Sequence, residues 1–212
     1  MKRNLTQALE HWIAEGIRSI GQISITPQPE GGFELRHLED AGRDDLTLHT
    51  SALDARGLSF FDDAKAYRPL KTAPTLRHGW RLQVQTAQEL RIALDYFYPA
   101  MTALWQSQLA GELRPVALRE TLNRQTGMYA ATKRLQDEEG QQLVGRHCAA
   151  TSCTKRIMWE FAPGQPLTEL SEQKRWPAPE GTHAIPLICQ EACNHLVPAC
   201  REVVKKRERA AG

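Results

Sequence analysis

The sequence predicts an α+β protein, with a small α+β domain over residues 1–85 and a mainly helical, cysteine-rich domain over residues 86–212. Polar and apolar residues alternate in short runs of the first part, which is typical of half-buried strands. The second part has the three- and four-residue apolar spacing of helices. The cysteines also divide the chain, because residues 1–147 contain none and residues 148–200 contain all five.

Length and charge limit the classes of function. A chain of 212 residues buries roughly 70% of the surface that its unfolded form exposes, so it can fold around its own core. Its 27 basic and 25 acidic residues leave a net charge of +2, too balanced to indicate nucleic-acid binding by itself. We find no signal peptide and no apolar run of the ~18 residues that a membrane span needs. We therefore expect a cytoplasmic protein, whose reduced thiols bind metal more often than they form disulfides.

The first part opens with a predicted helix over residues 5–20. Its apolar residues recur at three- and four-residue steps and form one stripe: Leu5, Leu9, Trp12, Ile13, Ile17 and Ile20. The side-chain oxygen of Asn4 can cap this helix by accepting a bond from a free N–H of the first turn. Gly21 is expected to mark its end.

Short strands are predicted after this helix. Residues 22–26 and 33–37 alternate, and the segment from Pro27 to Gly32 supplies turn residues between them, so we expect a hairpin. The further elements expected in this part are a strand over 46–49, a helical turn over 51–56 and a strand over 79–85.

The second part begins with a helix that a capping box starts, because Thr86 and Glu89 are spaced to bond each other's free N–H groups. Its apolar stripe consists of Leu90, Ala93, Leu94 and Phe97. Pro99 is expected to break or kink the chain. The remaining elements expected are helices over 101–109, over 116–124 and from near Cys189 to Val204, a loop around Gly140, and a basic tail at Lys205, Lys206 and Arg207.

Four of the cysteines form two close pairs of the kind that a soft-metal site needs. Four residues separate Cys148 from Cys153, three separate Cys189 from Cys193, and 35 residues lie between the pairs. Each pair can hold one edge of a metal centre once the fold brings the pairs together. Thiolates suit zinc and iron–sulfur clusters, since both are soft enough to share charge with sulfur.

Zinc sites usually have two residues between paired cysteines, whereas a [4Fe–4S] cluster has corners farther apart and fits wider gaps. We therefore assign a cluster to Cys148, Cys153, Cys189 and Cys193, with a zinc ion or buried redox thiols as the alternatives. The last two of these cysteines should share one face of a helix start. Cys200 is left over, as a core residue or as a replacement for one of the four.

The surroundings of the cysteines suit an anionic centre. Cations stabilise such a centre, and those that flank the first pair are Arg146, His147, Lys155 and Arg156. Trp159 and Phe161 could screen it from water. The segment from Arg124 to Tyr129 has two interpretations. It either ends a helix, with Gly127 in the left-handed conformation, or forms a strap that donates hydrogen bonds to cluster sulfurs.

The histidines and paired carboxylates give weaker indications. The histidines considered form no H-x3-H pair, and we expect each on the surface or in the core: His37, His78, His147, His183 and His195. His147 and His195 are of interest as neighbours of the cysteines. Carboxylate pairs such as Glu39-Asp40 are most simply solvated loop residues. The chain contains no nucleophile elbow, P-loop, Rossmann glycine pattern or H-E-x-x-H.

Several of these segments together resemble a known family. They are Tyr98-Pro99 with Trp105, the segment Arg124–Tyr129, the two cysteine pairs with Trp159, and the stretches Phe33–His37 and Arg77–Trp80. The chain is similar at these residues to the accessory and C-terminal [4Fe–4S] domains of multidomain proteins that look like the cobalt chelatases of cobalamin biosynthesis. The resemblance implies a cluster carrier that serves a separate chelatase by electron transfer, by sensing or by structure.

The same resemblance does not imply catalysis, because nothing in this sequence supplies the pair of histidine-bearing halves of a cobalt chelatase. We therefore expect the chain alone to be inactive, with a chelatase or redox protein as its partner and no membrane partner. The alternative is a nucleic-acid-associated protein whose four cysteines hold a structural zinc or iron–sulfur site, although the near-neutral charge argues against it. A third hypothesis is a redox sensor with Cys200 as the reactive thiol.

Overall fold

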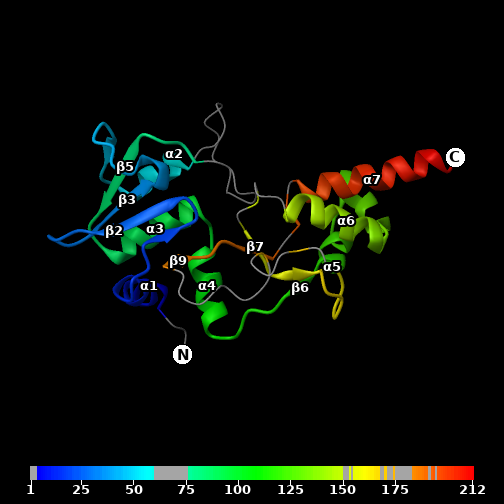
Figure 1. Ribbon diagram of the computed structural model, residues 1–212, viewed down its shortest axis with the longest axis horizontal. Coiled ribbons are helices and arrows are strands. Elements are labelled where there is room, and N and C mark those ends of the chain that lie inside the picture. The colour runs from blue at the N-terminus through cyan, green and yellow to red at the C-terminus, as the bar shows by residue number, and fades with distance from the viewer. Residues whose placement is uncertain are drawn as a thin grey trace. The chain divides into compact units, whose positions relative to one another are not determined.

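The computed structural model describes residues 4–59, 76–149, 153, 155–167, 170, 174, 183–190, 192–193 and 195–212. These residues form two compact units (Figure 1). The first unit holds the described residues up to Leu113 together with residues 183–187. The second holds those from Arg114 to Lys174 and from Ile188 to the C-terminus. Helices and strands both occur, which confirms the α+β class.

Six strands of the described residues form one sheet in the first unit, in the order β4-β5-β3-β2-β1-β9. Their bounds are β1 Ser19–Ile20, β2 Ile23–Pro27, β3 Phe33–His37, β4 Thr47–His49, β5 Trp80–Val84 and β9 Ala184–Ile185. β3 pairs antiparallel with β2 and with β5, and β4 runs parallel to β5. Because Ile25 of β2 lies opposite Leu35 of β3, the predicted hairpin is confirmed.

The helical elements of the first unit follow the predicted order. They are α1 Leu5–Ala14, η1 Leu38–Asp40, η2 Ala52–Asp54, α2 Ala55–Leu58, α3 Ala87–Phe97 and α4 Met101–Leu109. Asn4 caps α1 by accepting a bond from the Thr6 N–H at 3.0 Å, and Thr86 and Glu89 form the expected capping box on α3. These caps are confirmed because they depend on residues next to each helix in sequence.

The first helix is shorter than predicted. It ends at Ala14, and Gly16 adopts a positive φ of 111°, which terminates the helical turn. The Arg18 N–H then donates to the His183 carbonyl at 2.8 Å, and Ile20 lies in β1 beside β9. The last residue of the predicted apolar stripe, Ile20, is therefore part of a strand that pairs with β9 and not part of the helix.

The change between the two units comes after Leu113 rather than after residue 85, because the apolar stripe of α3 belongs to the first core. Leu90, Leu94 and Phe97 are fully or almost fully buried, and the Phe97 ring stacks on Trp80 of β5 with centroids 5.2 Å apart. α3 packs against α1, α2 and β5, so cutting the chain at residue 85 would expose this face.

The second unit combines helices with two short parallel strand pairs. Its helical elements are α5 Leu118–Asn123, η3 Gly127–Arg134, α6 Asp137–Cys148 and α7 Leu196–Ala210. Its strands are β6 Val116–Ala117 with β8 Trp159–Glu160, and β7 Arg156–Ile157 with β10 Ile188–Cys189. Among the described residues, no helix combines the length and apolar character that crossing a bilayer requires.

Three predictions for the second unit are wrong in detail. The expected helix over 116–124 begins only at Leu118, because the two residues before it pair with β8. Gly140 lies inside α6 rather than in a loop, and the ring of Phe161 packs directly against its Cα. The last helix begins at Leu196, because Cys189 is held in β10.

The contact between Gly140 and Phe161 gives a test of this packing. A Cβ at residue 140 would overlap the ring, so Gly140→Ala should lower the free energy of unfolding of the second unit by about 1–3 kcal/mol. Urea unfolding followed by far-ultraviolet circular dichroism measures this change. The matched control is Gly57→Ala in α2, where an added Cβ would meet no atom of the described residues within 4 Å and alanine should be neutral or stabilising. A Gly140→Ala protein as stable as its parent would contradict the contact.

The buried Tyr98 gives a prediction for alkaline pH. Burial raises its pKa to about 12, and the bond from the Gln22 N–H to its oxygen, 2.8 Å long, opposes the shift. An unfolded tyrosine has a pKa of about 10, so between pH of about 10 and about 12 the folded state keeps a proton that the unfolded state loses. The contribution to stability is therefore constant below this window and falls as pH rises through it.

Comparing the urea unfolding of the parent with that of Tyr98→Phe across this pH range isolates the effect from other titrating groups. The parent should be more stable near neutral pH, since the variant leaves the Gln22 N–H without its acceptor. The difference should shrink as pH rises toward about 12. A difference that does not change with pH would show that Tyr98 ionises normally.

Candidate metal centre

The two cysteine pairs of the second unit meet because two short strands pair. β7 begins three residues after Cys153, and β10 ends at Cys189, which lies directly opposite Ile157. The Met158 N–H donates to the Cys189 carbonyl at 2.7 Å, and the Ile157 N–H donates to the Lys174 carbonyl at 2.6 Å. The strand pair therefore fixes Cys189 beside the segment that follows the first cysteine pair.

Two packed helices supply the other members of the pairs. Cys148 is the last residue of α6, and Cys193 precedes α7, where its carbonyl accepts a bond from the Val197 N–H at 3.0 Å. α6 packs against α7, and Arg207 near the end of α7 pairs with Glu139 near the start of α6, so the end of α6 lies toward the beginning of α7. Since Cys189 lies in a strand, the prediction that Cys189 and Cys193 share a helix face is wrong.

Electrostatic coupling indicates how closely the sulfur atoms gather. Burial raises the pKa of Cys148, and the charges of the other four cysteines raise it further, Cys189 most and Cys200 least. Charge effects between thiolates decline with distance, so all five cysteines lie in one region. Ionising several thiols there is unfavourable unless cations are bound among them, which is the environment that a metal centre supplies.

In the described part of the chain, the sulfur atoms do not form a compact single-ion site. Among the described residues, which include all five cysteines, no three sulfur atoms lie within 4.8 Å of one another. Sulfurs bound about 2.3 Å from one tetrahedral zinc ion would be about 3.8 Å apart. The sulfur atoms of the described cysteines are therefore not gathered tightly enough, as they stand, for three of them to bind one such ion.

Apolar side chains surround the centre on its inner side. Cys148 and Cys189 are buried, Cys153 and Cys193 are half-buried, and Trp159 and Phe161 are buried in the same core as the cysteines. The indole N–H of Trp159 is buried and has no acceptor among the described residues. It is therefore a donor that an anionic sulfur could accept.

Cys200 differs from the other cysteines. It is fully buried within α7, and burial raises its pKa to about 12. Of the cysteines that act on Cys148 it has the smallest effect. Its position suits a core residue, and so high a pKa does not suit a reactive thiol.

Cations flank the first cysteine pair, although not all of those predicted face it. Lys155 is buried, Arg156 is half-buried with a pKa lowered by burial, and Arg146 is exposed. Lys174, which the sequence did not indicate, donates from Nζ to the Cys153 carbonyl. Of these residues Lys155 is the most buried, Lys174 Nζ contacts the first cysteine pair, and Arg146 faces solvent.

The two histidines near the cysteines interact with each other. Burial lowers the pKa of His147, and the charges of Arg146 and then of His195 lower it further. His147 is half-buried and His195 is exposed. They are therefore neighbours of the centre rather than members of the cysteine core.

The segment Arg124–Tyr129 does not behave as a strap of donors to the centre. Arg124 Nε and Gln125 Nε2 donate to the carbonyls of Glu120 and Thr121 in α5, at 3.2 and 3.1 Å. Gly127 has the expected left-handed backbone, with φ of 56°, but it begins η3, whereas Arg124 caps α5. The structure favours a local turn between two helical elements.

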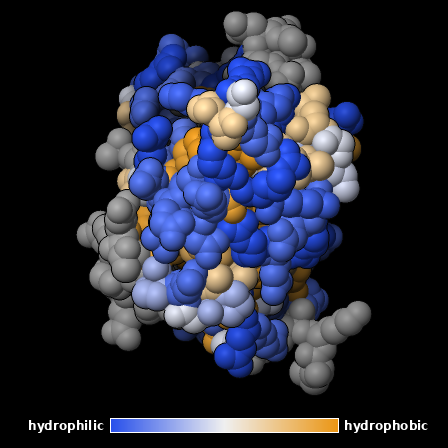
Figure 2. All heavy atoms as spheres, turned by 90° about the vertical axis from the view of Figure 1, so that its right-hand side faces the viewer, coloured by the Kyte–Doolittle hydropathy of each residue, from blue (hydrophilic) through white to orange (hydrophobic). Residues whose placement is uncertain are grey.

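The face of the molecule on the right-hand side of Figure 1, where α7 lies, is largely hydrophilic, as Figure 2 shows, with apolar side chains visible only between polar ones. The apolar stripe of α7 is turned inward instead, with Leu196, Val197, Cys200 and Val204 buried. The cysteines of the candidate centre therefore belong to the apolar core beneath α7 and not to this hydrophilic face.

Comparison with known proteins assigns the two halves of the chain. Residues 5–109 match the family model of the DR2241 stabilising domain, and residues 110–202 match that of a 4Fe-4S iron-sulfur cluster binding domain. In chain order, the sequence therefore matches a stabilising domain of the DR2241 type and then a 4Fe-4S cluster binding domain. The change between the two models after residue 109 lies close to the change between the compact units after Leu113.

Among solved structures, the chain is similar to DR2241 from Deinococcus radiodurans, a multi-domain protein with structural similarity to chelatases and with two additional novel domains. The TM-score is 0.72 at 29% sequence identity, over 95% of this chain and 41% of that one. The chain thus spans about two-fifths of the length of DR2241. No curated protein matches it. The predicted resemblance to accessory and cluster domains of chelatase-like proteins is confirmed.

One group outside this centre was not indicated by the sequence. His37, Glu39 and His78 lie together in the first unit. Asp40 is fully buried, so the interpretation of Glu39-Asp40 as solvated loop residues holds for Glu39 alone. The signal was hidden because the two histidines belong to segments that only the pairing of β3 with β5 brings together.

Proposed function

We propose that the second unit holds a [4Fe–4S] cluster through Cys148, Cys153, Cys189 and Cys193. The observation that carries the proposal is the gathering of these cysteines by the β7–β10 pair and the ends of α6 and α7, within a domain that matches a 4Fe-4S family. The four-residue and three-residue gaps within the cysteine pairs support a cluster over a zinc ion, whose paired cysteines usually have two residues between them. Cys200, the fifth cysteine, is a buried core residue and not a ligand in this proposal.

The residues around the cysteines suit such a group. When bound, a [4Fe–4S] cluster supplies a one-electron carrier whose potential depends on charge, hydrogen bonds and solvent exposure. Lys155 and Lys174 place positive charge near the first cysteine pair, which favours an anionic centre. Trp159 and Phe161 exclude water from the inner side, and the Trp159 N–H can donate to sulfur.

The likeness to DR2241 supports a role for the centre beside a chelatase. In DR2241 two additional domains accompany a part that is similar to chelatases. We propose that this chain acts in the same way, as an accessory protein in the cytoplasm that serves a tetrapyrrole chelatase of the cobalamin type or a redox protein. Electron transfer and sensing both fit a cluster with two half-buried cysteine ligands.

Single cysteine replacements test the ligand set. Alanine at residue 148, 153, 189 or 193 should each sharply lower the iron and sulfide content of anaerobically purified protein from about four of each per chain. A missing thiolate leaves one iron open to water and oxygen. Cys200→Ala is the matched control, because it removes a buried thiol from the same region and should leave the iron content unchanged. Iron and sulfide analysis with electron paramagnetic resonance measures the outcome.

Two results would contradict this assignment. Colourless protein with one zinc per chain would exclude the cluster. Loss of iron in Cys200→Ala together with its retention in Cys193→Ala would place Cys200 among the ligands. Circular dichroism of each variant separates the loss of a ligand from the loss of the fold.

The accessory role is tested by assaying cobalt insertion into a tetrapyrrole. The chain alone should insert no metal, since chelation needs a base and a metal ligand facing each other across a substrate cleft. Addition of a separate chelatase should give a rate above that of the chelatase by itself, and Cys153→Ala should abolish the increase. Insertion by the chain alone would overturn the accessory role, and an unchanged rate in the mixture would remove the chelatase as the partner.

A further inference from the structure

A buried histidine in the first unit has an unsatisfied nitrogen. His37 ends β3 and is 1% exposed. Its Nδ1 accepts a hydrogen bond from the Glu39 backbone N–H at 3.1 Å, while its Nε2 has no hydrogen-bond partner among the described residues. Buried polar atoms are nearly always satisfied, so such an atom indicates a bound partner, which is an acceptor such as water while Nε2 carries the ring proton, or a metal ion once that proton is lost.

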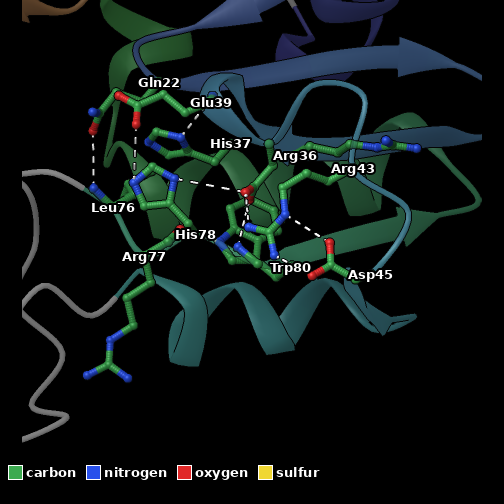
Figure 3. A network of polar contacts seen from close by, with 12 residues as sticks. Gln22, Arg36, His37, Glu39, Arg43, Asp45, Leu76, Arg77, His78 and Trp80 are labelled. Carbon is green, nitrogen blue, oxygen red and sulfur yellow. Dashed lines mark hydrogen bonds and ion pairs between the residues drawn. The ribbon is translucent and has the colours of Figure 1, made fainter.

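Two further donor groups converge on this histidine (Figure 3). The rings of His37 and His78 have centroids 4.0 Å apart, and His78 Nε2 lies 3.6 Å from Glu39 Oε2. One donor atom from each of the three residues lies within 4.8 Å of the others. Donors bound to one tetrahedral ion lie about 3.3 Å apart, so only small side-chain movements are needed. Glu39 and His78 reach the surface, where such movements are easily made.

The residues behind these donors hold them in place. Asp40 is fully buried, and its carboxylate accepts bonds from Arg43 Nη1 at 2.9 Å and from the Gly79 N–H at 2.7 Å. The same carboxylate lies 4.0 Å from His78 Nδ1. A carboxylate behind a histidine orients the ring and raises the basicity of its other nitrogen, as it does for metal-binding histidines.

We propose that His37 Nε2, His78 Nε2 and the Glu39 carboxylate form a site for a divalent transition-metal ion of the zinc type, with Asp40 orienting His78. Two imidazoles and one carboxylate are the ligands that zinc and ferrous iron use when a coordination position stays open to water or substrate. The exposure of Glu39 and His78 provides that opening. This site lies in the first unit and does not depend on the cysteine centre.

The hydrogen bond at Nδ1 gives the site a distinctive signature. Because Nδ1 accepts the Glu39 N–H, the ring proton of metal-free His37 is on Nε2. A metal that binds Nε2 displaces this proton, and the neutral ring then carries it on Nδ1. The bond from the Glu39 N–H is lost, so the tautomer of His37 and the Glu39 amide resonance should change together.

The experiment is a titration of the full, cluster-loaded chain with Zn²⁺ under anaerobic conditions, followed by long-range ¹H–¹⁵N spectra of the histidine rings. One zinc per chain should saturate the site, move the His37 proton from Nε2 to Nδ1 and shift His78. Glu39→Gln and His78→Gln change exposed side chains and should each lower zinc affinity by at least about tenfold. His37→Asn keeps an acceptor for the Glu39 N–H and should also lose the site.

The matched control is His11→Gln. His11 Nε2 lies 3.3 Å from Glu15 Oε1 on the exposed face of α1. This pair has the same ligand types as His78 and Glu39 but lacks a buried second imidazole. Zinc binding should be unchanged in this variant. A His37 tautomer that stays constant at zinc saturation, shifts confined to His147 and His195, or full affinity in both Glu39→Gln and His78→Gln would each overturn the proposal.

Discussion

The parallel pairing of β7 with β10 is the constraint on which the second unit depends. Each strand has only two residues, yet the pair sets Cys189 beside the segment that follows Cys153 and joins parts of the chain that are far apart in sequence. So short a ladder contributes few hydrogen bonds, and closing the chain between its strands costs conformational entropy. A metal centre that bridges the same segments would make metal binding and folding of this unit one event, as in other small metal-binding domains.

The first unit is held together by an apolar core between its sheet and α3. Its sheet buries alternate apolar residues against α3, so it has a core without any metal. The group of His37, Glu39 and His78 lies where β3 ends and just before β5 begins, and the buried Asp40 carboxylate links the two segments through the Gly79 N–H. A domain that is stable in its own right provides a rigid support, and a rigid support is what a preorganised ligand set requires.

Much of the fold could be predicted from the sequence because the signals are local. Asn4, Thr86 and Glu89 act on residues within one turn, and the alternation that predicts β2 and β3 needs no knowledge of the rest of the chain. The cysteine set was indicated by spacing alone. The features that could not be predicted are decided by distant partners. The Phe161 ring packs against Gly140 within α6. Ile20 pairs with β9 and does not continue the first helix. His37 and His78 meet only because β3 pairs with β5.

The four candidate ligands are unequally buried, so the two sides of the centre differ in their access to solvent. Cys148 and Cys189 are buried in the core, whereas Cys153 and Cys193 are half-buried, so one edge of the ligand set faces the apolar interior and the other approaches solvent. Electron tunnelling favours the shortest path, and small oxidants reach the most accessible sulfur first. The edge marked by Cys153 and Cys193 is therefore the side from which a redox partner would dock and also the side on which oxidative damage would begin.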